Sequence, residues 1–131
     1  MTLRYAADLR NAKLDAIATF VGNAALVRIY DGTQPATGGA PTTLLAELTC
    51  GTPFAAAAAG GVLTVGAVTQ DSSANATGTA TWFRVVKADG TTHCIDGTAG
   101  TSGADLNLTT TSIVSGQPVQ ITSFTITDGN P

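Results

Sequence analysis

The stretch "NATGTATWFRVVKADGTT", residues 75–92, contains the single tryptophan of the chain and decides how the sequence is interpreted. In a strand, successive side chains point to opposite faces. Large side chains follow one another from Trp82 onward, so a strand here is apolar on both faces. The two sets are Thr79, Thr81, Phe83 and Val85, and Ala80, Trp82, Arg84 and Val86. A small domain has one core, so one face is buried there and the other needs a different cover.

Short apolar segments bounded by turn residues recur along the rest of the chain. They are "AALVRIYDG" (24–32), "TLLAELTC" (43–50), "VLTVGAVTQ" (62–70), "TATWFRVVKADG" (79–90), "THCID" (92–96), "DLNLTTTSIV" (105–114) and "PVQITSFTITDG" (118–129). Strands of this length with frequent turns are typical of all-β domains. We therefore predict a mainly β fold, an antiparallel β-sandwich or jelly roll over residues 24–131, and the sequence leaves open how the strands connect.

The first 22 residues predict a helix or arm that precedes the β-domain. Polar residues recur at helical spacing in one stripe, and apolar residues, including Leu9 and Phe20, occupy much of the remaining circumference. The stripe consists of Asp8, Asn11, Asp15 and Thr19. Gly22 and Asn23 are suitable residues for a helix end. Such a helix either docks across the sheet or packs into a neighbouring subunit.

The composition argues against several classes of partner. Only 11% of the residues are charged and the net charge is −3, whereas an average domain has about 25% charged residues. Six scattered cations form no phosphate-binding patch, so we expect no nucleic acid. No apolar run approaches the roughly 20 residues that span a bilayer. A weakly charged surface rich in Thr and Ala favours association with other proteins.

The start of the chain has charges throughout and no apolar signal-peptide segment. We therefore expect the protein to fold in a cytoplasm, with Cys50 and Cys94 as free thiols.

The chain contains few residues that could carry out catalysis or hold a metal. Its single histidine, His93, precedes Cys94, but adjacent strand residues point to opposite faces. Zinc needs three or four ligands, and a serine hydrolase needs a nucleophile and an oriented base. We expect no catalytic site, no cofactor and no metal.

Four Asp-Gly pairs, at 31–32, 89–90, 96–97 and 128–129, are explained by turn geometry. The stretch "DGTAGTSGAD" (96–105) has a weak similarity to calcium loops, which supply several alternating oxygen ligands. Calcium binding therefore stays a minor alternative.

Five side chains are the candidate anchors of a core or of an interface. They are Trp82, Arg84, Phe83, Leu9 and Phe20. Trp82 suits the core of a β-sandwich, but Trp and Arg are also enriched at binding hot spots, and Arg84 shares its face. Truncation costs a similar free energy in either setting, so the two interpretations are separated only by measuring folding and assembly independently.

Several motifs, taken in order, resemble a family of small virion structural proteins of tailed bacteriophages. The most specific are "RIYDGTQP", "ATGTATWFR" and the segment Gly103-Ala104-Asp105-Leu106-Asn107-Leu108. The resemblance runs through nearly the whole chain. It implies a particle component, made in the host bacterial cytoplasm and located in the virion, without a catalytic motif.

Among such components, we expect a capsid decoration or cement protein. This class consists of small β-rich proteins, often dimers or trimers, that bind the major capsid protein or other virion proteins of a preformed shell. The alternatives are a tail, neck or fibre protein and, from another class, a carbohydrate- or receptor-binding module that uses loops 33–43 and 96–104. We expect both loops to be exposed, and loop 33–43 is rich in Gly, Pro and Thr. The module would need clustered exposed aromatic side chains, and these loops contain none.

Overall fold

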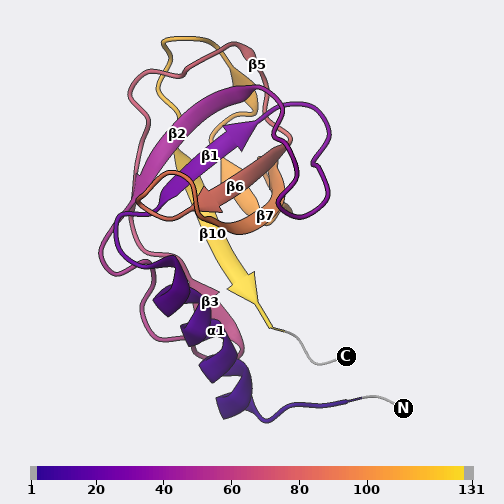
Figure 1. Cartoon of the computed structure of the whole chain (residues 1–131), viewed down its shortest axis with the longest axis vertical. Coiled ribbons are helices and arrows are strands. Elements are labelled where there is room, and N and C mark those ends of the chain that lie inside the picture. The colour runs from indigo at the N-terminus through magenta and orange to yellow at the C-terminus, as the bar shows by residue number, and fades with distance from the viewer. Residues whose placement is uncertain (1–2, 129–131) are drawn as a thin grey trace.

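The structure is a computed structural model that describes residues 3–128. One helix and ten strands lie within them, and in the view of Figure 1 the helix lies below most of the strands and beside β3. Their bounds are α1 (Ala7–Val21), β1 (Leu26–Tyr30), β2 (Leu44–Cys50), β3 (Val62–Thr64), β4 (Val68–Thr69), β5 (Gly78–Thr79), β6 (Trp82–Val86), β7 (His93–Gly100), β8 (Leu106–Leu108), β9 (Ser112–Ile113) and β10 (Ile121–Thr127). The predicted mainly β fold with an N-terminal helix is confirmed.

Eight strands form one large curled sheet. Their order is β3-β10-β8-β7-β6-β1-β2-β4, and β5 pairs with β9 in a separate two-stranded sheet. All pairs are antiparallel except β7 and β8, which run parallel. The two layers expected of a sandwich are therefore two halves of a single sheet that face each other across the core (Figure 1).

The sheet curls because its two edge strands are close neighbours in sequence. Only residues 65–67 separate β3 from β4, which lie at opposite ends of the strand order. Val65 N donates to Phe124 O of β10 at 3.1 Å, and Gly51 N, just after β2, donates to Ala67 O at 3.1 Å. This short segment thus bonds to both sides of the sheet and draws its edges together.

Three of the seven predicted strands are each divided in two. The stretch 62–70 becomes β3 and β4, 79–90 contains the end of β5 and all of β6, and 105–114 becomes β8 and β9. In each case the chain leaves one strand partner and joins another within a few residues. Hydropathy alone does not mark such a change in 62–70 and 105–114, because both halves of each stretch contain buried or partly buried apolar side chains.

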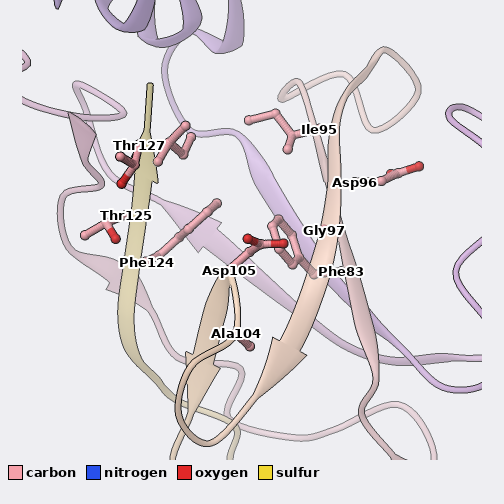
Figure 2. Close-up of a pocket in the computed structure, with 10 residues that line it drawn as sticks. Phe83, Ile95, Asp96, Gly97, Ala104, Asp105, Phe124, Thr125 and Thr127 are labelled. Carbon is pink, nitrogen blue, oxygen red and sulfur yellow. The ribbon is translucent and has the colours of Figure 1, made fainter. Parts of the chain in front are cut away.

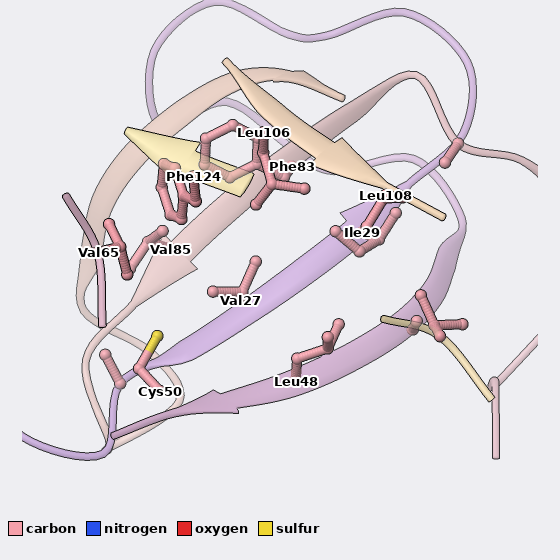
Figure 3. Close-up of a cluster of buried hydrophobic side chains, with 14 of the residues drawn as sticks. Val27, Ile29, Leu48, Cys50, Val65, Phe83, Val85, Leu106, Leu108 and Phe124 are labelled. Atoms are coloured by element: carbon pink, nitrogen blue, oxygen red, sulfur yellow. The ribbon is translucent and has the colours of Figure 1, made fainter. Parts of the chain in front are cut away.

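The core lies inside the curled sheet (Figure 3). Val27 and Leu48 from one half of the sheet meet Leu106 and Phe124 from the other within a single buried cluster. The Phe83 and Phe124 rings pack edge to face, with centroids 5.1 Å apart, an arrangement favoured by aromatic quadrupoles.

Strand β7 corrects one turn prediction. Asp96 and Gly97 lie in the middle of β7 rather than in a turn, and the strand continues to Gly100. A Cβ at Gly97 would lie 2.6 Å from Cε1 of Phe83. Glycine is therefore placed here because the Phe83 ring packs against the backbone, a recognised role of glycine within strands.

Helix α1 ends where the sequence predicted. Gly22 has φ +77° and its N–H donates to Ala18 O at 3.1 Å, which closes the last turn. Leu14 and Val21 are the buried residues of the helix. Within residues 3–128 no helix has the length and apolar character needed to cross a bilayer.

Candidate functional site

The outer face of β6 is covered by a loop of the chain itself, residues 31–43. Trp82, which is 1% exposed, stacks on Tyr30 of β1 with ring centroids 4.4 Å apart. Its Nε1 donates to Asp31 O and to Thr42 Oγ1, each at 3.0 Å. The loop carries exposed residues, as predicted. Its inner side covers the second apolar face of the Trp82 strand, the face for which the sequence suggested no cover.

Arg84 joins the tip of this loop to the sheet. Its Nε and one terminal nitrogen contact Asp96 at 2.7 Å and 3.0 Å, and a terminal nitrogen donates to Gly39 O at 2.9 Å. The guanidinium also lies 5.3 Å from the centre of the Trp82 ring. This bidentate pair anchors the loop over the indole, and Arg84 is only 8% exposed.

The pair shifts both ionisation equilibria. The hydrogen bonds to Asp96 raise the pKa of Arg84 above its ordinary value. Burial disfavours the charged form of Asp96, but the hydrogen bonds and charge of Arg84, together with His93, outweigh it and lower the pKa of Asp96. Both groups therefore stay charged at neutral pH.

His93 and Cys94 diverge, as adjacent strand residues do. His93 Nε2 lies 3.1 Å from Asp96 Oδ1, whereas Cys94 packs against the core and its sulfur lies 3.7 Å from Thr92 O. A thiolate–imidazole pair is not assembled by these two residues. Residues 3–128 contain no cluster of three or more His, Cys, Asp or Glu side chains placed to hold a metal ion.

The Asp-Gly pair at 89–90 forms the predicted turn. Asp89 Oδ1 accepts hydrogen bonds from the N–H groups of Thr91 and Thr92, at 2.8 Å and 2.9 Å, and Gly90 has φ +76°. Gly32 likewise has φ +72°. The pair at 128–129 extends beyond the described residues.

Helix α1 docks with a different face from the one its sequence suggests. Asn11 Oδ1 accepts from Gly61 N at 2.9 Å and Asp15 Oδ1 from Ala58 N at 2.7 Å. Arg10 donates to Asp128 O at 2.7 Å, and Lys13 pairs with the Asp128 carboxylate at 2.8 Å. Part of the predicted polar stripe thus faces the protein, because it satisfies backbone groups of the segment 58–61.

The opposite side of α1 presents apolar side chains to solvent. Leu9 is 49% exposed and Phe20 is 53% exposed; Ala12 and Ala16 between them are also exposed. Spacings of three, four and four residues place these four side chains on one face. We call Leu9, Ala12, Ala16 and Phe20 the α1 apolar stripe.

The five sequence-based candidates therefore separate into two groups. Trp82, Phe83 and Arg84 are buried within the chain, while Leu9 and Phe20 are exposed. The structure also places Tyr30, Gly39 and Asp96 around Trp82 and Arg84. None of these three was a candidate anchor, and Asp96 was considered only as part of a turn or a calcium loop. The sequence contained one signal for the Arg84–Asp96 pair. The two residues are equally far from Gly90 in the predicted turn, so a hairpin around that turn places them opposite each other, as the structure does.

Comparison of the chain with protein-family models, with curated proteins and with solved structures finds no match.

Proposed function

We propose that the protein is a non-enzymatic structural component of a tailed-phage virion that binds the assembled head as a decoration or cement protein. The observation that carries the proposal is the position of the exposed apolar side chains. Leu3, Leu9 and Phe20 are three of the four large hydrophobic side chains that are exposed within residues 3–128. All three belong to the N-terminal arm and α1.

The attachment of α1 supports a docking role for this surface. Polar contacts hold the helix to segment 58–61 and to Asp128, so the α1 apolar stripe faces away from them. Exposed apolar patches of this kind are typical of protein–protein interfaces. A partner of this stripe is expected to offer an apolar surface, such as a shell of the major capsid protein or another virion protein.

Composition and motifs support the same assignment. With 11% charged residues, attachment depends on buried area more than on ion pairs, and salt is expected to weaken it little. The motifs "RIYDGTQP" and "ATGTATWFR" resemble those of phage particle proteins.

The mechanism follows from binding equilibria. A protein that binds only the assembled shell stabilises that state by mass action. Attachment at many equivalent sites also gives firm collective binding from weak individual contacts, provided that neighbouring copies engage together. The shell then withstands heat or internal pressure better than an undecorated shell.

The test is a pair of density maps, one of the purified particle and one of a particle from a phage that lacks the gene. The proposal predicts loss of density over the shell and failure of the particle at lower temperature. Density lost at the neck or tail, with an unchanged shell, would move the assignment to a tail, neck or fibre component. Absence of the protein from purified particles would overturn the virion assignment altogether.

A further inference from the structure

The curled sheet has an unfilled strand position between β7 and β10. Strand β8 lies between them but pairs only with residues 99–100 of β7 and 121–124 of β10. Residues 95–97 of β7 and 125–127 of β10 lie beyond the N-terminal end of β8 and have no strand between them. They border a hollow of about 410 Å³ (Figure 2). We call this hollow the β7–β10 slot.

Backbone groups of β10 face the slot. Val65 N donates to Phe124 O at 3.1 Å and Asp128 N donates to Gly61 O at 2.9 Å, so residues 124, 126 and 128 direct their N–H and C=O groups toward β3. Because these directions alternate along a strand, the N–H and C=O of Thr127 point into the slot. No strand within residues 3–128 pairs with β10 on that side beyond Phe124.

Backbone groups of β7 face the slot from the other side. Ala99 N donates to Thr81 O, toward β6, at 3.1 Å, whereas Thr98 N donates away from β6 to Asp105 Oδ2 at 3.0 Å. By the same alternation, the N–H and C=O of Asp96 point into the slot. If β8 continued in register toward its N-terminal side, one of its residues would lie between Asp96 and Thr127 and could bond to both. No β8 residue occupies that position, because β8 begins at Leu106.

The side chains of the slot have the pattern that a strand would complete. Ile95 and Ile126 are only partly buried against the core, and Phe83 and Phe124 lie beneath them. At the end nearest β8, the Asp105 carboxylate accepts hydrogen bonds from Thr98 alone and has no cation partner within residues 3–128. The slot therefore has main-chain hydrogen-bond donors and acceptors along β7 and β10 and apolar side chains on its core side, which we call the apolar floor. An extended polypeptide can bind such a site as an added strand.

We propose that the N-terminal arm of a second copy of this chain, residues 3–6, fills the β7–β10 slot as an added strand. Residues 3–6 are neither helix nor strand and precede the first turn of α1, and the centre of the Tyr5 ring lies 4.2 Å from Nζ of Lys13 (Figure 1). Leu3 is 55% exposed and suits the apolar floor. Arg4 has no ion pair within residues 3–128, and its charge complements Asp105.

The inference concerns self-association alone and does not rest on the virion assignment. The arm, residues 3–6, lies outside the α1 apolar stripe, so insertion of the arm does not use the surface that is proposed to bind the shell. Strand addition of this kind gains affinity from main-chain hydrogen bonds and specificity from the alternating side chains.

The test uses full-length proteins in which Cys94→Ser removes the half-buried thiol. One protein carries Leu3→Cys, the second carries Ile126→Cys, because the Ile126 side chain faces the core side of the slot as Leu3 is proposed to do, and the third, as a matched control, carries Val114→Cys at an exposed site that does not line the slot. The first is mixed with the second or the third and oxidised mildly. Because docking raises the local thiol concentration to about mM, compared with about 10 μM of each protein in the mixture, we expect the first pair to cross-link about 100-fold faster.

Equal rates for the two mixtures would overturn the proposal. So would a disulfide within one chain of a Leu3→Cys/Ile126→Cys double variant, migrating at monomer mass, because the arm would then occupy its own slot. As an independent readout, Leu3→Asp is expected to lower the mass measured by sedimentation equilibrium, while Val114→Asp leaves it unchanged. An unchanged mass for Leu3→Asp would likewise contradict arm exchange.

Discussion

The Trp82 indole and the Tyr30 ring are stacked, with centroids 4.4 Å apart and planes 16° from parallel, on the outer face of the sheet. Loop 31–43 covers them, and Arg84 fixes its tip through Gly39. The chain therefore builds a second, smaller buried layer outside its main core.

Truncation of this layer is expected to destabilise the fold. Trp82→Ala removes a fully buried aromatic side chain and should lower the free energy of unfolding by about 3–5 kcal/mol. Urea denaturation followed by circular dichroism measures the change. Val114→Ala is the control, because Val114 is exposed and should change stability by less than about 0.5 kcal/mol. Equal effects of the two substitutions would show that the layer contributes nothing.

A methyl group at position 97 is expected to disturb the main core. Gly97→Ala places its Cβ 2.6 Å from the Phe83 ring, and this overpacking should cost about 1–3 kcal/mol. Gly66→Ala is the matched control, since its nearest contacts are carbonyl oxygens at 3.6 Å and its φ is not positive. Thermal denaturation of both variants should show a loss for the first and little change for the second.

The Arg84–Asp96 pair predicts a loss of stability in acid. The folded-state pKa of Asp96 is below its ordinary value of 3.8, so its contribution is complete above pH 3.8 and is lost as the pH falls through the folded-state pKa. Stability should therefore be flat from pH 7 to about 5 and should fall below about 4.

The variant Asp96→Asn isolates this contribution. Removing one partner of a largely buried pair costs about 3–5 kcal/mol, and we expect the low end at pH 7 because Asn keeps one acceptor oxygen. The dependence on acid should become shallower. Asp89→Asn is the comparison, because hydrogen bonds from Thr92 and Thr91 also lower the pKa of Asp89. If Asp96→Asn retained the full acid dependence, Asp89 or another carboxylate would be responsible.

The two thiols are expected to react at very different rates. Burial raises the pKa of Cys50 to about 11, and Cys50 is only 4% exposed. Burial also raises the pKa of Cys94, but its side chain is partly accessible. At pH 8 a thiol reagent should modify Cys94 in the folded protein and Cys50 only after unfolding. In Cys94→Ser the reaction of the folded protein should disappear; a remaining fast phase would show that Cys50 is accessible.

The positions of the helix and strands were predictable from the sequence, whereas the pairing of the strands with one another was not. Strand positions and the end of α1 at Gly22 follow from hydropathy and glycine placement, which are local. The curl of the sheet depends on residues 65–67 bonding to two distant strands, and no local pattern records this. The double-faced strand at Trp82 was visible, but its cover was a Gly/Pro/Thr-rich loop whose composition suggested only exposure.

The orientation of α1 shows the same limit. Asn11 and Asp15 form part of a polar stripe that would ordinarily face solvent. They face the protein because segment 58–61 presents backbone N–H groups that need acceptors. Leu9 and Phe20 were candidate anchors, and the structure leaves them exposed.

The most direct test of the central proposal is binding of purified protein to particles that lack it. Leu9→Asp/Phe20→Asp places charge on the α1 apolar stripe, and Val114→Asp places it at the fourth exposed site. We expect the double variant to keep its melting temperature but no longer to decorate particles in a sedimentation assay, while Val114→Asp binds like the unmodified protein. Full decoration by the double variant would show that the α1 apolar stripe does not bind the shell.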